Sequence, residues 1–236
     1  METPRNWHEG TRPQPDTLKV VFLLSAELKP GFQASRIWIP ALAVFWAFSL
    51  AVGMYVAVDY QNRPGEPGHP PAVFPDHSRL KLSSTSPTLI INVHPHCPCT
   101  RASLEELGRV VARASRQPQI YALFLRPEEF PPDWIKTDLY VSALLIPNMT
   151  VLDDYQGEET KRFGSATSGQ VYLYEPDGRL VFSGGITGSR GHAGDNSGAE
   201  GLAALLRDEH SPGSVTPRVF GCPLQERGEA QCPTTI

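Results

Sequence analysis

The chain has 236 residues, a net charge of −4 and a hydrophobic content of 40%. That length fits one domain of ordinary size plus additional segments. The acidic balance excludes nucleic-acid binding that depends on phosphate neutralisation. Four cysteines are too few for a domain held together mainly by disulfides.

An uncharged apolar run occupies residues 37–58, IWIPALAVFWAFSLAVGMYVAV. As a helix it would be roughly 33 Å long, which matches a hydrocarbon core of about 30 Å. The run is longer than the apolar region of a signal peptide, and the YVAVDY sequence at its end is a poor cleavage site. We therefore expect a retained membrane anchor rather than a cleaved signal or a buried core helix.

The basic residues around this run predict its orientation. Five lysines and arginines precede it, and Arg63 alone lies in the short stretch that follows. Because basic residues remain on the cytoplasmic side, residues 1–36 are expected in the cytoplasm. The prediction is a single-pass protein of the cytoplasmic membrane whose C-terminal domain is on the periplasmic or extracytoplasmic side.

The remainder of the chain divides by composition into a linker, a domain and a tail. Residues 59–87 are rich in proline and favour an extended, semi-rigid spacer. Regular patterns begin at residue 88 and end near residue 210. The tail, residues 211–236, contains Cys222 and Cys232.

Within residues 88–210 the patterns indicate alternating strands and helices. Strands are expected at 88–93 and 119–125, with a helix at 103–114 between them and a less regular helical stretch at 134–146. Residues 151–152 are a short apolar piece before a loop. The EPDG turn predicts a hairpin of residues 169–174 and 179–184, and a closing helix is expected at 199–208. The fold class is therefore α/β, with a mixed four-stranded sheet and helices on both faces.

The most informative motif is HPHCPCT, residues 94–100, between the first strand and the first helix. Cysteines at a helix N-terminus favour the thiolate form. Pro98 suits the first helical position, which would make Cys97 the N-cap and place Cys99 in the first turn. Alternatively, Ser103 and Glu106 form a capping box, and both thiols lie in the preceding loop. The sequence leaves both alternatives open.

The motif and its surroundings resemble thioredoxin-like proteins, and among these the membrane-anchored proteins of the RedB type. The resemblance covers residues 88–224 and rests on four stretches, HPHCPCTRASLEEL, TSGQVYLYEPDGRLVFSGGIT, SRGHAGDN and FGCPL. It implies a thioredoxin-like mixed sheet flanked by helices, and a thiol-disulfide function outside the cytoplasmic membrane. The partner would be a protein thiol or disulfide, including the cysteines of an apo-metalloprotein.

Two departures from ordinary thioredoxins matter for the expected mechanism. Cys97 and Cys99 form C-x-C rather than C-x-x-C, and a disulfide between them would be strained and easily reduced. Gly169 stands where thioredoxins have a cis-proline, so ordinary substrate docking is in doubt. Cys97, as the more exposed N-terminal cysteine, is the expected attacking thiolate and Cys99 the resolving thiol. We expect substrate contacts from a set of four residues, Pro98, Ser168, Gly169 and His192.

A metal site is the alternative. His94, His96, Cys97 and Cys99 supply two imidazoles and two thiols, which suit copper or zinc, with His192 as a further ligand. The dithiol function needs no cofactor.

Two other segments have open roles. The glycine-rich residues 184–201 are either a flexible loop or a cover over the cysteines, with Arg190 or His192 favouring the thiolate. Cys222 either pairs with Cys232 in a structural disulfide or folds back to resolve a mixed disulfide at Cys97 or Cys99.

Overall fold

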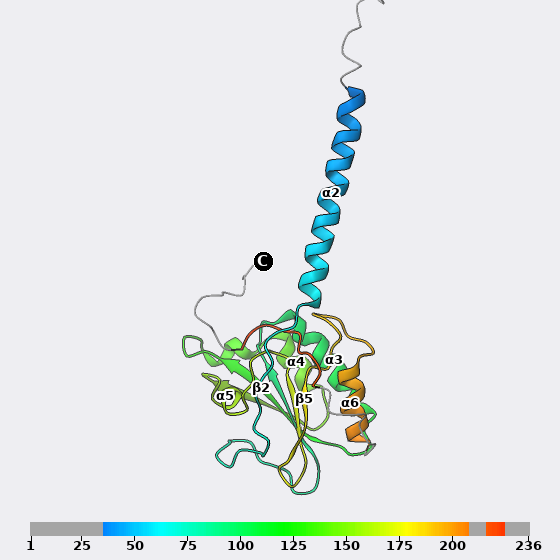
Figure 1. Cartoon of the computed structure of the whole chain (residues 1–236). Helices are drawn as coiled ribbons and strands as arrows, with labels where there is room; N and C mark the ends of the chain where they lie inside the picture. Colours follow the sequence, from blue (N-terminus) through cyan, green and yellow to red (C-terminus); the bar gives the residue numbers. More distant parts are fainter. Residues whose placement is uncertain (1–34, 208–215, 225–236) are drawn as a thin grey trace, which may run out of the picture. The chain divides into compact units, whose positions relative to one another are not determined.

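The computed structural model describes residues 35–207 and 216–224. Most of the expected cytoplasmic segment, the junction between domain and tail, and Cys232 lie outside these residues. The chain separates into two units, Met1–Tyr55 and Val56–Ile236. The second unit carries the sheet (Figure 1).

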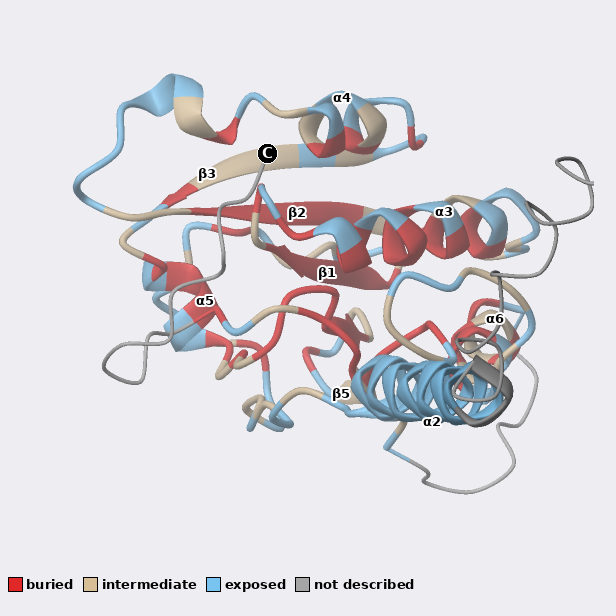
Figure 2. Ribbon diagram, turned by 90° about the horizontal axis from the view of Figure 1, so that it is seen from above, coloured by how far each residue is buried: buried red, intermediate tan, exposed pale blue. Residues whose placement is uncertain are grey.

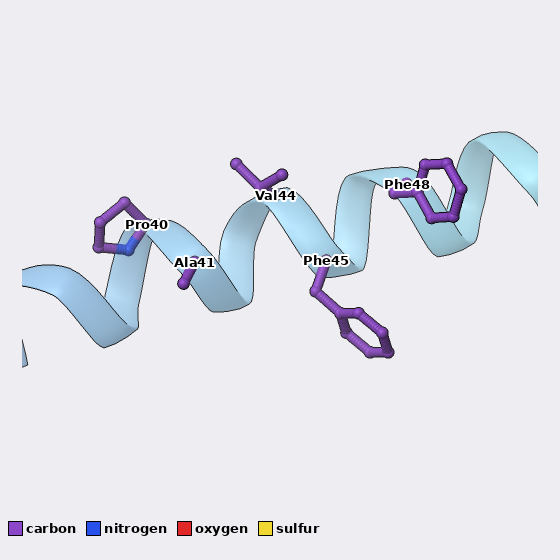
Figure 3. A pocket seen from close by; sticks show the side chains of 5 residues that line it. All are labelled: Pro40, Ala41, Val44, Phe45 and Phe48. Atoms are coloured by element: carbon purple, nitrogen blue, oxygen red, sulfur yellow. The ribbon is translucent and has the colours of Figure 1, made fainter.

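The apolar run forms one continuous helix, α2, spanning Ser35–Asn62, which extends beyond the expected anchor at both ends. Its part from Trp38 to Asn62 is long and apolar enough to cross a membrane, and none of that window is buried within the protein. The side chains of Val44, Phe45 and Phe48 project outward from the helix (Figure 3). Apolar side chains that face outward in this way suit contact with lipid.

The domain is built on a five-stranded mixed sheet with the order β3-β2-β1-β4-β5. Strands β1 (Thr88–Val93), β2 (Gln119–Arg126) and β3 (Met149–Tyr155) are parallel. The EPDG hairpin forms as predicted, with β4 (Val171–Tyr174) antiparallel to β1 and β5 (Leu180–Gly184) antiparallel to β4. The fold class is confirmed, but the expected count of four strands is wrong.

The additional strand is β3, which we expected to be a short apolar piece and a loop. Its charged residues have specific partners that make them compatible with an edge strand. Arg126 on β2 pairs with Asp153 at 2.8 Å. Asp154 is fully buried and accepts hydrogen bonds from the backbone N–H groups of Glu159 and Thr160, both at 2.9 Å. Asp154 thus caps the short helix α5 (Glu158–Arg162).

One face of the sheet packs against helices α3 (Pro98–Ala112), α4 (Asp138–Leu144) and α6 (Ser197–Leu206). The stretch expected to be helical at 134–146 is divided into a 3-10 turn, Pro132–Ile135, and α4. The core on this face joins alternate residues of β1 with Leu107 of α3 and Leu202 of α6. Figure 2 shows β1 and β2 buried along their length, whereas α3 turns an exposed face outward.

The other face of the sheet is covered mainly by residues that we expected to form a spacer. Phe74 and Leu80 are buried and pack with Tyr172, Tyr174 and Phe163 in a second core. The Tyr174 hydroxyl donates to the Pro71 carbonyl at 3.0 Å, and the His69 N–H donates to the Gly164 carbonyl at 2.8 Å. Residues 63–87 therefore belong to the globular unit, because they supply the apolar cover that this face needs.

Candidate functional site

The site lies where β1 ends and α3 begins. Cys97 is the N-cap residue of α3, with extended backbone angles (φ −86°, ψ 109°), and Pro98 occupies the first helical position. Cys99 is therefore in the first turn, while Ser103 lies buried inside the helix. The alternative with Cys97 as N-cap is confirmed and the Ser103 capping box is wrong. The reason is that Pro98 needs no backbone hydrogen bond at that position and has a φ angle already suited to the helix.

Cys97 is the centre of a cluster of three cysteine side chains. Its sulfur accepts the backbone N–H of Cys222 at 3.3 Å. The Cys222 thiol, the Cys99 thiol and the Thr100 hydroxyl also donate hydrogen bonds to it, and together these donors lower the pKa of Cys97 far below the ordinary thiol value despite burial. These donors favour the thiolate form of Cys97.

The exposure of these cysteines differs from the sequence-based expectation. Cys97 is fully buried, Cys99 is 8% exposed and Cys222 is partly exposed. The expectation that Cys97 is the more exposed of the motif's two cysteines is therefore wrong. The turn of β1 into α3 directs the N-cap side chain inward, where the segment around Cys222 covers it.

Cys99 is held in the opposite protonation state. Its hydrogen bond to the Cys97 sulfur, its burial and the negative charge on Cys97 all raise its pKa above the ordinary thiol value. The guanidinium of Arg190 acts in the other direction through its charge and a hydrogen bond. Of the two motif cysteines, the surroundings therefore favour Cys97 as the thiolate and Cys99 as the thiol.

Ser168 and Gly169, which we expected to contact substrate, are buried and tie the loop before β4 to the motif. The Ser168 hydroxyl accepts from the backbone N–H of His94 at 2.8 Å and lies 2.6 Å from the Thr100 hydroxyl. Gly169 has a φ of +87°, and a Cβ there would lie 2.7 Å from the Ser103 hydroxyl oxygen. Glycine is required by both the backbone conformation and the close approach.

His94 and His96 lie beside an aromatic side chain that the sequence did not single out, Trp134. The ring centroids of His96 and Trp134 are 4.6 Å apart, and those of His94 and Trp134 are 5.6 Å apart. His94 Nδ1 accepts the backbone N–H of His96 at 3.2 Å. Burial lowers the pKa of His94 and so favours its neutral imidazole. Trp134 lies about 40 residues from these histidines, so no local sequence pattern predicts that their rings are in contact.

The expected metal ligands do not form a metal-binding group in this arrangement. Within residues 35–207 and 216–224, no set of three or more His, Cys, Asp or Glu side chains is placed to hold a metal ion. The imidazoles are packed on Trp134 instead.

The glycine-rich loop covers the cysteines through Arg190 rather than through His192. Arg190 donates to the Gly221 carbonyl at 2.6 Å, in addition to its hydrogen bond with Cys99. His192 is exposed, and its Nδ1 lies 2.7 Å from the carbonyl oxygen of Arg190. Glu106 of α3 anchors the loop by accepting the backbone N–H of Gly194. Pro98, the remaining expected substrate contact, is exposed at the start of α3.

Comparisons with known proteins give structural likenesses. Neither the family models nor the curated proteins that were searched contain a match. Among solved structures, an uncharacterized conserved protein from Geobacillus kaustophilus is similar, with 21% identity, 72% of this chain and 95% of that chain covered, and a TM-score of 0.49. Bradyrhizobium japonicum ScoI with copper bound has 20% identity, coverage of 61% and 99%, and a TM-score of 0.39. A secreted Mycobacterium tuberculosis disulfide oxidoreductase has 17% identity, coverage of 52% and 84%, and a TM-score of 0.38.

The arrangement of the elements identifies the fold. A parallel β1-α3-β2 unit is followed by an antiparallel β4-β5 hairpin that pairs with β1, and the last helix, α6, packs on the face that α3 covers. A cysteine motif lies at the junction of β1 and α3. The domain has a thioredoxin-like fold, and one apolar helix long enough to span a membrane precedes it.

Proposed function

We propose that this protein exchanges thiols and disulfides with a partner protein outside the cytoplasm, using Cys97 as its redox-active thiolate. The supporting observation is the cluster around Cys97, in which two thiols, a hydroxyl and a backbone N–H donate to one sulfur. A thiolate is the form that attacks a disulfide, and it is also the better leaving group when a disulfide is reduced. The second sulfur comes from one of the two thiols that contact it, Cys99 or Cys222.

The surroundings also suit a dithiol that cycles between two oxidation states. Arg190 contacts Cys99 and balances part of the negative charge in the cluster. Thr100 and Ser168 join the motif to the loop before β4, so the cysteines are held on rigid elements. A purely structural set of buried cysteines would not need this concentration of hydrogen-bond donors on one sulfur.

The proposal extends to location and to the finer family resemblance. We place the domain on the periplasmic or extracytoplasmic side of the cytoplasmic membrane, since the basic residues precede α2 in the sequence. We also propose, from the motif resemblance, that the chain is a RedB-type protein. A C-terminal fusion to alkaline phosphatase, which folds only outside the cytoplasm, should be active. If that fusion is inactive and a C-terminal fusion to green fluorescent protein is fluorescent, the domain is on the cytoplasmic side and the proposed orientation is wrong.

Exchange with glutathione disulfide tests the redox function. The reduced full-length protein in detergent should lose its ultraviolet thiolate absorbance when glutathione disulfide is added, and dithiothreitol should restore it. Cys97→Ser should show neither change. Cys232→Ser, which lies outside the described residues, serves as the matched control and should behave as the wild type.

The same sample separates this function from copper or zinc binding. Elemental analysis of the purified protein, with and without added copper(I) or zinc, should show no stoichiometric metal. One metal ion per chain that is lost in a His94→Ala/His96→Ala double variant, together with no reaction with glutathione disulfide, would replace the redox proposal by metal binding or delivery.

A further inference from the structure

The chain returns to the cysteine site after α6 through residues 216–224, which we call the C-terminal strap (red in Figure 1). The strap is seated in the domain. The N–H of Gly65 donates to the Val219 carbonyl at 2.8 Å, and the N–H of Gly185 donates to the Pro217 carbonyl at 3.2 Å. Phe220 and Leu224 are buried. The strap is therefore a fixed part of the structure.

Glycines allow the strap to approach the domain backbone closely. A Cβ at Gly185 would lie 2.3 Å from the Arg218 carbonyl oxygen, and a Cβ at Gly221 would lie 1.9 Å from the Ser168 carbonyl oxygen. No side chain fits at either distance. The backbones of the strap and the domain can therefore approach this closely only because both positions are glycine.

Backbone pairing places Cys222 directly over Cys97. Thr167 and Pro223 form an antiparallel bridge. On either side of it, the Ser168 N–H donates to the Cys222 carbonyl at 2.8 Å and the Leu224 N–H donates to the Ala166 carbonyl at 2.9 Å. This pairing directs the N–H of Cys222 to the Cys97 sulfur at 3.3 Å, and the Cys222 thiol also donates to that sulfur.

Cys99 is less suited to a disulfide with Cys97, although its thiol also contacts Cys97. The two residues are separated by Pro98 alone, so a disulfide between them would close a small, strained ring. A disulfide between them would require the first turn of α3 to change, because disulfide geometry is narrow. Cys222 lies on a separate segment, the C-terminal strap, and its backbone N–H already contacts the Cys97 sulfur. Cys222 is also partly exposed, whereas Cys97 is fully buried, so Cys222 is the more accessible of these two residues to an external thiol.

We propose that the redox-active disulfide of this protein links Cys97 to Cys222, with Cys99 remaining a thiol that hydrogen-bonds the Cys97 sulfur. The proposal rests on the thiol-disulfide function above and names the second sulfur. Oxidation would then lock the strap covalently onto the start of α3.

The exchange balances with a disulfide as the oxidant. Cys222, after losing its proton, attacks glutathione disulfide, forms a mixed disulfide and releases one glutathione thiolate, which takes up that proton. The Cys97 thiolate then attacks the Cys222 sulfur, so the Cys97–Cys222 bond forms and the second glutathione leaves as a thiolate. Two electrons pass from the two cysteines to glutathione disulfide. In the reverse direction a thiolate attacks Cys222, and Cys97 is the stabilised leaving group.

The sequence provides a direct test by peptide mapping. Trypsin is expected to release residues 82–101 with both motif cysteines, residues 219–227 with Cys222, and residues 228–236 with Cys232. The full-length protein in detergent is equilibrated in an oxidising glutathione buffer, quenched with acid, alkylated, digested and analysed by mass spectrometry. We expect peptide 82–101 cross-linked to peptide 219–227 in the wild type, in Cys99→Ser and in Cys232→Ser.

Cys222→Ser should lose the cross-link and the two-electron equilibrium with glutathione. A disulfide internal to peptide 82–101, or a link between peptides 219–227 and 228–236, would overturn the proposal while leaving a redox function in place. The absence of any disulfide at every glutathione ratio would instead contradict the proposed function itself. The wild-type map alone decides the pairing if a variant fails to fold.

Discussion

The contact between the C-terminal strap and Ser168 yields a prediction with a worked magnitude. In Gly221→Ala the new methyl group would lie 1.9 Å from the Ser168 carbonyl oxygen, and both atoms belong to backbone that is held in place. The strap must therefore move away from the loop before β4. That movement breaks three hydrogen bonds, two between the backbones of the strap and the loop and one from the Cys222 N–H to the Cys97 sulfur.

Each of these hydrogen bonds contributes about 1 kcal/mol net, so their loss amounts to about 3 kcal/mol. Because 1.4 kcal/mol corresponds to a factor of ten, the equilibrium constant for forming the Cys97–Cys222 disulfide against glutathione should fall roughly 100-fold. Loss of apolar contacts at Phe220, which is buried, would add to this effect.

The assay is alkylation and mass analysis of the full-length protein across a glutathione series. Gly188→Ala is the matched control, because a Cβ there meets only Asn196, at 3.8 Å. Gly188→Ala should retain the wild-type equilibrium. An unchanged equilibrium in Gly221→Ala, within a factor of two, would refute the inference that the strap positions Cys222.

Three further predictions concern the thiolate and the fold. The pKa of Cys97 is lower in the folded protein than in an unfolded chain. The stability that the Cys97 thiolate contributes is therefore complete above the pKa of the unfolded thiol and declines as the pH falls towards the pKa of the folded protein. In urea unfolding, the reduced wild type should lose stability more steeply on acidification than Cys97→Ser. Thr100→Val removes one hydroxyl donor to the sulfur and should move the pH midpoint of thiolate absorbance upward; an unmoved midpoint would exclude Thr100 as a donor. Asp154→Ala removes the buried carboxylate that caps α5 and should lower the free energy of unfolding by about 2 kcal/mol. It should leave the glutathione equilibrium unchanged. A change in that equilibrium would mean that the cap also supports the cysteine site.

Local patterns predicted the elements nearest the site because each carries its own signal. The EPDG turn fixed the β4-β5 hairpin, and the β-branched run of β1 followed by Pro98 indicated a strand opening into a helix. The start of α3 remained open, since Pro98 and Ser103 are both acceptable first-turn signals. The structure selects Pro98, where the missing N–H costs nothing.

The parts that sequence could not predict depend on partners distant in the chain. Asp153 and Asp154 read as loop residues, and they are compatible with β3 only because Arg126 and the N–H groups of α5 engage them. Phe74 and Leu80 lie among prolines and polar residues, so no periodic pattern of apolar residues predicts that they belong to the second core.

The contact of Cys222 with Cys97 also joins residues that are distant in the chain. It spans 125 positions of sequence, and four cysteines allow several pairings. The backbone pairing at Thr167 brings Cys222 to Cys97.

A redox titration of the full-length protein tests the central claim most directly. The protein is equilibrated across a series of glutathione ratios, its free thiols are alkylated, and its intact mass gives the number of cysteines that escape alkylation. The proposed function predicts a single two-electron transition in which two cysteines become protected, and no such transition in Cys97→Ser. Alkylation of every cysteine at all ratios, or a transition that survives Cys97→Ser, would contradict it.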